Sequence, residues 1–215
     1  MDWLLRMLRR RAPADEGRWV VLDVEASGLD AARDRLLAIA ALGLHVDGGR
    51  AQIELADSFE VVLRQPDSAA PSDKANILLH GIGVGAQRSG VAVAEALDAF
   101  ERFVARSPLV GFHVAFDRTL IERAFAACRR ARPDNRWLDL EPLAAALLPQ
   151  SQARALDDWL AHFGICCLQR HHAVADALAT AELLLHLWPR LCQERATGIE
   201  AARRLAAERR WLTPR

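Results

Sequence analysis

Four acidic residues and one histidine have the types and spacings that could bind a divalent metal ion. Asp23 and Glu25 follow a compact apolar run, and a spacing of two places both side chains on the same face of a strand. An otherwise buried strand tolerates paired carboxylates poorly unless a cation compensates their charge, so this pair could share a metal ion. Taken alone, two solvent-facing acids at a strand end beside a Ser-Gly turn would explain the pattern equally well.

Asp117 and Asp176 each lie near the start of a predicted helix. Asp117 comes directly after a predicted strand and turn, where an acid commonly complements the helix dipole. Asp176 lies in an early turn of a later helix, and His171 precedes it by five residues. A histidine followed by an acid is usually a surface feature. No single one of these positions therefore indicates a function.

Taken in chain order, three segments resemble the three motifs of the DnaQ-like (DEDDh) 3′-to-5′ exonuclease family. The segments are DVEASGLD from Asp23, GFHVAFD ending at Asp117, and HHAVAD from His171 to Asp176. Residue type, internal spacing, chain order and the predicted strand or helix context agree with the motifs Asp-x-Glu, Gly-x-x-x-x-Phe-Asp and His-x-x-x-x-Asp. The resemblance covers about residues 19–187 and implies a ribonuclease H-like α/β fold.

The resemblance implies that Asp23, Glu25, Asp117 and Asp176 hold two divalent ions and that His171 is the general base. Oxygen-rich ligands favour Mg²⁺ or Mn²⁺ over zinc, and two such ions neutralise charge at an attacked phosphate. An imidazole that titrates near neutral pH could accept the proton of the attacking water. The implied partner is a single-stranded nucleic-acid 3′ end, DNA in preference to RNA, with a DNA polymerase complex as a candidate assembly.

Substrate contacts are expected from Ser27, Gly28, Leu29 and His113. Leu29 aligns with a residue that in the family often packs beside the terminal base, although a core leucine is an equal alternative. Phe112-His113 stands where family members often have a His-Asn pair. Loss of that asparagine amide puts in doubt how the terminal nucleotide is oriented.

Several neighbouring residues receive structural interpretations. His172 is four residues before Asp176, a spacing that does not match the motif, so it is assigned to the surface and His171 is preferred. His80 is interpreted as a loop residue and Asp139 as a strand-end acid. The tyrosine-type branch of the superfamily is excluded because the chain contains no tyrosine.

Two alternative functions stay open. One is an exoribonuclease that trims RNA 3′ ends, because discrimination rests on contacts to a 2′-hydroxyl and no motif decides it. The other is a catalytically silent nucleic-acid-binding protein. The complete set of acids argues against silence, because a binding module has no need of carboxylates where phosphates must come.

Composition limits the class of protein. The 215 residues suit one domain, and 28 basic residues balance 28 acidic ones, so bulk electrostatic coating of long duplexes is disfavoured. The four cysteines show no CxxC spacing, which favours a reduced, cytoplasmic protein. The apolar run near the N-terminus is too short for a signal peptide, and no segment is long enough to span a membrane, so no membrane partner is expected.

The elements that position these residues are predicted from periodicity and turn signals. Residues 19–24 read as a buried strand, and the runs 35–46 and 51–63 flank an Asp-Gly-Gly turn and therefore form an antiparallel hairpin. Residues 66–90 are predicted to be mostly loop, with a short helix around 75–79.

The second half of the chain alternates strand and helix before becoming helical. Helices are predicted at 91–106 and 116–130 and short strands at 108–111 and 137–140, which implies a parallel portion covered by helices. Later helices are predicted at 155–163, 174–188 and 191–212. The expected organisation is an N-terminal basic extension (1–18), an exonuclease domain (19–190) and a C-terminal helical extension (191–215).

Overall fold

A mixed sheet of five strands forms the centre of the molecule in the computed structural model, which describes residues 16–47, 49–66, 68 and 74–212. The strands lie in the order β3-β2-β1-β4-β5. Their bounds are β1 Arg18–Ala26, β2 Leu36–Asp47, β3 Arg50–Val62, β4 Leu109–Gly111 and β5 Trp137–Asp139. β1 and β2 pair antiparallel, as do β2 and β3, whereas β4 pairs parallel with both β1 and β5. The predicted hairpin followed by parallel strands is confirmed.

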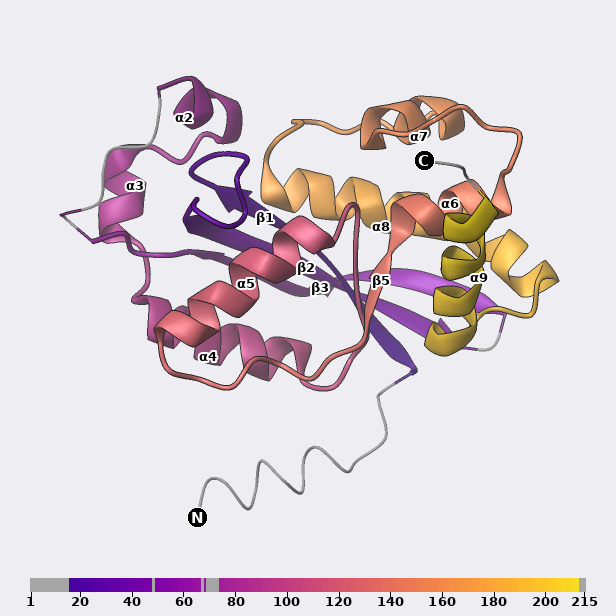
Figure 1. Ribbon diagram of the computed structural model, residues 1–215, viewed down its shortest axis with the longest axis horizontal. Helices are drawn as coiled ribbons and strands as arrows, with labels where there is room; N and C mark the ends of the chain where they lie inside the picture. Colours follow the sequence, from indigo (N-terminus) through magenta and orange to yellow (C-terminus); the bar gives the residue numbers. More distant parts are fainter. Residues whose placement is uncertain (1–15, 48, 67, 69–73, 213–215) are drawn as a thin grey trace, which may run out of the picture.

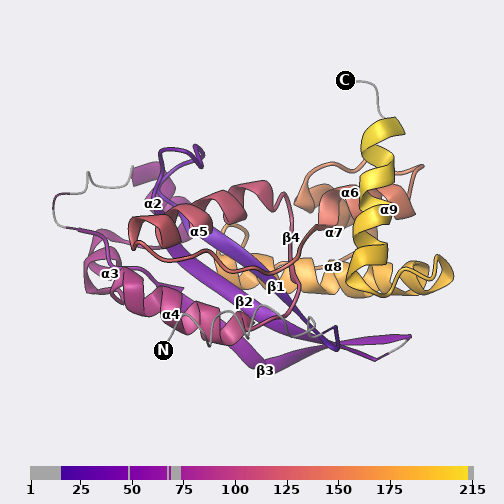
Figure 2. The same ribbon diagram turned by 60° about the horizontal axis from the view of Figure 1, so that its bottom comes forward.

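Helices cover both faces of this sheet (Figures 1 and 2). Their bounds are α2 Lys74–His80, α3 Val84–Ser89, α4 Val93–Val104, α5 Ala115–Ala127, α6 Leu140–Leu147, α7 Leu156–Phe163, α8 Ala173–Gln193 and α9 Ile199–Leu212. α4 and α5 lie on one face, and α6 to α9 lie on the other. Within the described ranges, no helix is both long and apolar enough to cross a membrane.

The two faces of β1 bury alternate residues in two separate cores. Trp19 and Val21 pack with α6, α7, α8 and α9, whereas Val20 and Leu22 pack with α4 and α5. This is the period of two that a strand covered on both sides requires. Asp23 and Glu25 lie two and four residues after Val21 and therefore on the same face of β1 as Trp19 and Val21. Both acids thus lie on the side of the sheet that α8 covers.

Three predictions of secondary structure are wrong. The segment 66–90 is not mostly loop, because α3 follows α2 within it. The helix expected to stop before Pro189 continues to Gln193, and the last helix begins at Ile199 rather than at 191. A proline removes one backbone hydrogen bond, and the fully buried Leu187 and Leu191 on either side of it pack well enough to offset that loss.

Arg18 joins elements that are far apart in the sequence. Its guanidinium donates to both carboxylate oxygens of Asp57 on β3, at 2.6 and 2.8 Å, and to Ser107 Oγ at 2.9 Å. The same guanidinium lies over the Phe103 ring, 4.8 Å from its centre. These hydrogen bonds lower the pKa of Asp57, and they hold the irregular part of β3 against the start of β1.

We predict that Gly43→Ala destabilises the protein by about 1–3 kcal/mol, the usual cost of overpacking. Gly43 lies where the β2–β3 register shifts, and an added Cβ would come within 1.8 Å of Asp57 Oδ2. The carboxylate would have to leave Arg18. Urea denaturation should show this loss, and the same change should cost less in an Asp57→Ala background. Equal costs in the two backgrounds would show that Asp57 is not the obstacle.

Candidate active site

Four carboxylates from three elements come together at the carboxyl end of β1. Asp23 and Glu25 lie on the last part of β1, Asp117 lies in the first turn of α5, and Asp176 lies in the first turn of α8. Asp117 and Asp176 are 4% and 6% exposed, which is too little for ordinary helix-terminal acids on a surface. The structure thus brings the four predicted acids together at one end of the sheet.

Burial and mutual repulsion raise the pKa of three of these acids. Burial is the largest cause of the rise in the pKa of Glu25 to about 8, with Asp176 and Asp117 adding to it. Burial also raises the pKa of Asp117 to about 7, with a contribution from Asp139. The pKa of Asp23 is raised well above its usual value by burial and by the charges of the other three acids. The cluster therefore holds its full negative charge only at a cost in stability.

The backbone partly offsets this cost. The start of α8 hydrogen-bonds to Glu25 through the backbone of Ala173, and the backbone of Val24 hydrogen-bonds to Asp117. Both contacts lower the pKa of the carboxylate that they reach. α5 and α8 also direct their N-terminal ends, which carry partial positive charge, toward the cluster.

Arg170 supplies a positive charge inside the cluster. Its guanidinium forms ion pairs with Asp176 and with Asp157 in the first turn of α7. It also lowers the pKa of both Asp23 and Glu25. Sequence reasoning missed Arg170 and Asp157, because an arginine beside a histidine motif carries no signal of its own and Asp157 lies 13 residues away.

The donor set of the cluster fits hard divalent cations. In the part of the chain that the structure describes, no three His, Cys, Asp or Glu side chains are already placed to hold a metal ion, and Asp176 is paired with Arg170. However, Glu25 Oε1 is buried and has no hydrogen-bond partner among the described residues. A bound cation would satisfy this buried carboxylate oxygen, which lies beside acids with raised pKa values.

His171 lies at the edge of the cluster, in the loop between α7 and α8. It is exposed, its backbone has a positive φ of 61°, and its backbone N–H donates to Asp176 Oδ2 at 3.1 Å. Asp176 thus holds the backbone of His171 in place. His172 lies at the N-cap position of α8, where its side chain makes no capping hydrogen bond.

The predicted substrate contacts lie on loops beside the cluster. Ser27 Oγ donates to Asp34 Oδ1 at 2.9 Å, and a Cβ on Gly28 would come within 2.5 Å of the same carboxylate, so Asp34 shapes this turn. Leu29 is 92% exposed, which rules out the alternative of a core leucine. His113 is also exposed, has a φ of 58°, and donates its backbone N–H to Asp139 Oδ1.

Asn76 and His80 anchor α2 beside the end of β1. Asn76 Nδ2 donates to the Ala26 carbonyl at 2.8 Å and lies 3.1 Å from His80 Nε2. His80 is buried, its Nδ1 accepts from the Ile82 N–H, and burial lowers its pKa. The structural interpretation of His80 is therefore supported, although it ends α2 rather than lying in a loop. Asn76 carried no sequence signal because its partner is 50 residues away.

Comparison with known families decides the class of this site. The family model described as "Exonuclease" matches residues 20–184, a range that contains all four acids and His171. The chain belongs to this exonuclease family. Relatives of this chain include the PolC-type DNA polymerase III of Oceanobacillus iheyensis, 31% identical over 83% of the chain, and a DNA polymerase III subunit epsilon-like protein of Rhodobacter capsulatus, also 31% identical over 83%. The chain spans only 12% and 25% of those two proteins.

Solved structures of nucleases share the fold of this chain. The nuclease domain of 3′hExo, a DEDDh family member bound to rAMP, matches with a TM-score of 0.71 at 14% identity and covers 85% of this chain and 96% of that domain. E. coli exonuclease I in complex with a dT13 oligonucleotide matches with a TM-score of 0.68 at 19% identity, over 82% of this chain and 42% of that one. The predicted ribonuclease H-like α/β fold is thus confirmed.

We predict that the protein in chelator loses stability as pH rises from about 5 to about 8. Glu25 and Asp117 bind protons more tightly in the folded state, so their contribution is complete below their unfolded pKa values of 4.5 and 3.8. It is lost as pH passes their folded values of about 8 and about 7. Melting temperatures measured in chelator should fall over this range.

Glu25→Gln should flatten this pH dependence, because it removes one of the titrating groups. Glu95→Gln, a matched change on the exposed surface of α4, should leave the dependence as it is in the wild type. A melting temperature that rises from pH 5 to pH 8 in the wild type would contradict the raised pKa values.

Proposed function

We propose that this exonuclease removes nucleotides one at a time from the 3′ end of single-stranded DNA by a two-metal mechanism. The observation that carries the proposal is the convergence of four carboxylates around a buried, unpartnered oxygen of Glu25. A site this acidic would repel a phosphodiester unless cations masked its charge. A phosphate substrate at this site would therefore require bound cations.

Asp23, Glu25, Asp117 and Asp176 would hold two Mg²⁺ or Mn²⁺ ions. When bound, the ions would neutralise the attacked phosphate and orient it for in-line displacement. Of the four acids, Asp176 also holds the backbone of His171, so one ligand would position the general base as well.

His171 would accept the proton of the attacking water. Its imidazole is exposed beside the cluster, and an imidazole nitrogen can take up a proton from water that attacks beside it. Ser27, Gly28, Leu29 and His113 would contact the terminal nucleotide. Leu29 in particular presents an apolar side chain to solvent, where a base could pack against it.

DNA is the proposed substrate because the relatives that match most of this chain are DNA polymerase III proteins. The same names make a DNA polymerase complex the proposed partner. The second candidate function is trimming of RNA 3′ ends, and a structural neighbour that was solved with rAMP favours it. The proposed organisation keeps an exonuclease domain at residues 19–190 between extensions at 1–18 and 191–215, of which residues 1–15 and 213–215 lie outside the described part.

We predict stepwise release of mononucleotides from linear single-stranded DNA, with Mg²⁺ or Mn²⁺ required and circular DNA resistant. Asp23→Ala should abolish release while the protein stays folded. Millimolar Mn²⁺ should raise the melting temperature of the wild type, because it binds only the folded state, and should raise that of Asp23→Ala less. Electrophoresis of 5′-labelled DNA and RNA of one sequence would separate the two candidate functions. Cleavage of a circle at a comparable rate would overturn the proposal.

A second prediction separates His171 from His172. His171→Ala should lower turnover by on the order of 10²–10⁴-fold, the usual worth of a positioned proton acceptor, while binding of Mn²⁺ survives. His172→Ala is the matched control and should turn over close to the wild-type rate. The opposite ranking of the two variants would assign the general base to His172.

A further inference from the structure

A groove lies on the α5 and α9 side of the molecule, next to the site described above. It encloses about 420 Å³ between the start of α5, β5, the start of α6 and α9. Its walls include Arg118, Thr119, Trp137, Asp139, Pro142 and Arg203. The groove therefore combines two guanidinium groups, a hydroxyl, a carboxylate and an aromatic side chain.

The groove begins at the margin of the candidate active site. Val114 and Ala115, just before Asp117, line it, and Asp139 in its wall accepts a hydrogen bond from the His113 backbone at 3.0 Å. The same Asp139 oxygen also accepts from the Glu141 N–H at 3.3 Å. A nucleic-acid strand that left the active site on this side would enter the groove within a few nucleotides.

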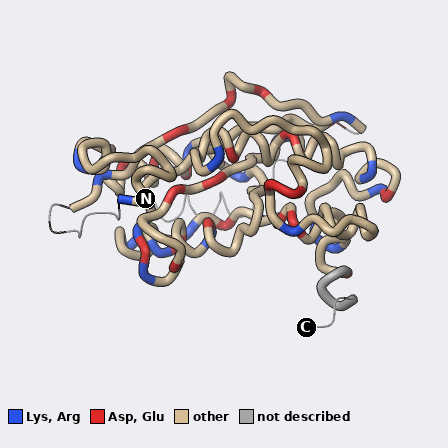
Figure 3. Tube along the Cα trace, turned by 90° about the horizontal axis from the view of Figure 1, so that it is seen from above, with Lys and Arg blue, Asp and Glu red and all other residues tan. Residues whose placement is uncertain are grey.

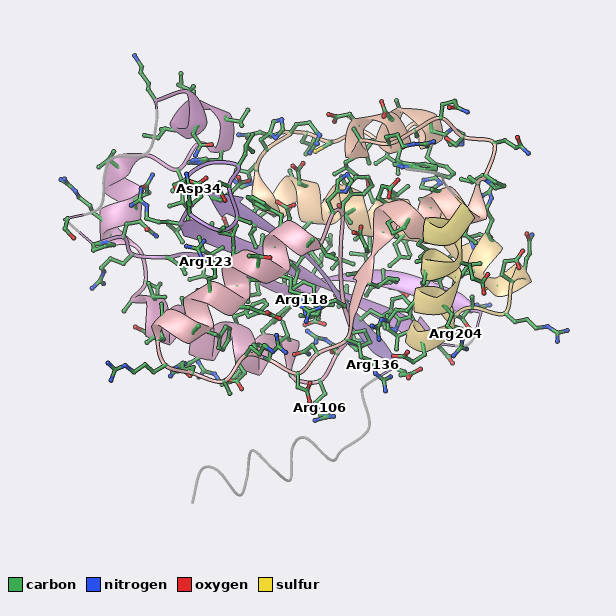
Figure 4. The ribbon with its side chains drawn as sticks, viewed as in Figure 1. Asp34, Arg106, Arg118, Arg123, Arg136 and Arg204 are labelled. Atoms are coloured by element: carbon green, nitrogen blue, oxygen red, sulfur yellow. The ribbon has the colours of Figure 1, made fainter. Side chains whose placement is uncertain are left out.

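Further arginines extend the basic character beyond the groove. Figure 4 shows Arg118, Arg136 and Arg204 on one face of the molecule, between α5 and α9. Elsewhere the two signs of charge are interspersed along the chain (Figure 3). Because the net charge of the chain is zero, a local arginine cluster is the kind of feature that would attract a polyanion.

The arginines of the groove are held in ion pairs that a phosphate could replace. Arg118 pairs with Glu122 at 2.8 Å, and Glu200 pairs with both Arg203 at 3.0 Å and Arg136 at 3.2 Å. The side chains of Arg118 and Arg203 are 46% and 44% exposed. Exposed pairs of this kind contribute little to stability, and a guanidinium can exchange a carboxylate for a phosphate of similar geometry.

We propose that this groove binds the sugar–phosphate backbone of the single strand whose 3′ end lies in the active site. The inference rests on the proposed function for the direction of the strand. Arg118 and Arg203 would contact phosphates, and the partly exposed Trp137 offers an aromatic face to a base, the combination typical of single-strand binding surfaces. DNA and RNA share this backbone, so the groove would serve either.

The test is fluorescence anisotropy with 5′-labelled single strands of 16 and 4 nucleotides, in DNA and RNA forms, with the full chain in chelator to prevent hydrolysis. Arg118→Ala with Arg203→Ala should weaken binding of the 16-mer about ten-fold. The slope of log affinity against log salt concentration should become shallower by about 0.7 for each phosphate that an arginine no longer neutralises. The double variant should also lose most of the affinity advantage of the 16-mer over the 4-mer.

Glu200→Gln should have the opposite effect and tighten binding of the 16-mer, because it releases Arg203 from its carboxylate partner and leaves Arg136 paired with Glu16 alone. Arg50→Ala removes an exposed arginine from β3, the opposite edge of the sheet from β5, and should leave the affinity unchanged. Melting temperatures of all variants establish that each is folded.

Three results would overturn the groove proposal: an unchanged affinity in the double variant, an equal loss in Arg50→Ala, or weaker binding in Glu200→Gln. These results are independent of catalysis. If the double variant weakens binding and no nucleotide is ever released, the groove stands and the proposed function falls. If nucleotides are released and the double variant binds normally, the proposed function stands and the groove proposal falls.

Discussion

Repulsion among carboxylates at the end of a buried strand is the constraint on which this structure depends. Asp23 and Glu25 continue the face of β1 that otherwise buries Trp19 and Val21, so the same strand must serve a core and an anionic site. The raised pKa values of Asp23, Glu25 and Asp117 mean that the fold disfavours the ionised forms of these three acids. A site with this electrostatic character favours any cation that reaches it.

Two helix N-termini and an arginine, held in fixed orientations by the fold, offset the repulsion among the carboxylates. The starts of α5 and α8 meet the carboxyl end of β1, and the backbone of Ala173 hydrogen-bonds to Glu25. Arg170 adds a positive charge, because its guanidinium bridges Asp176 and Asp157 and thereby joins the first turns of α8 and α7. Any cation that takes Asp176 must compete with Arg170, so cation binding and the conformation of the His171 loop are physically connected.

The sheet topology is what makes this convergence possible. Parallel pairing of β1 with β4 brings the start of α5 to the same edge where β1 ends, and α8 crosses the other face. The antiparallel hairpin of β2 and β3 widens the sheet beside the cluster, because β2 pairs Ala40 with Asp23 and Ala38 with Glu25. Arg18 holds β3 in place through Asp57. Because each apolar face of β1 is covered by its own helices, the position of the acids is determined by two cores rather than one.

The spacing of Asp23, Glu25, Asp117, His171 and Asp176 was enough to predict the family, the order of strands and helices around the motifs and the presence of an acidic cluster. These inferences succeeded because they depend on local periodicity and on which face a side chain takes. The end of α8 and the start of α9 were mispredicted around Pro189, because the burial of Leu187 and Leu191 outweighs a single proline and burial is not local information.

Only the tertiary structure decided which distant residues share the site. Arg170 with Asp157, Asn76 with the Ala26 carbonyl, and the groove between α5 and α9 all depend on contacts between segments whose separation in the sequence has no periodic signal. The sequence by itself determined the chemistry of the cluster, because residue type and spacing dictate which groups a strand or helix presents. The electrostatic environment of that cluster depends on distance and burial, and these exist only once the chain has folded.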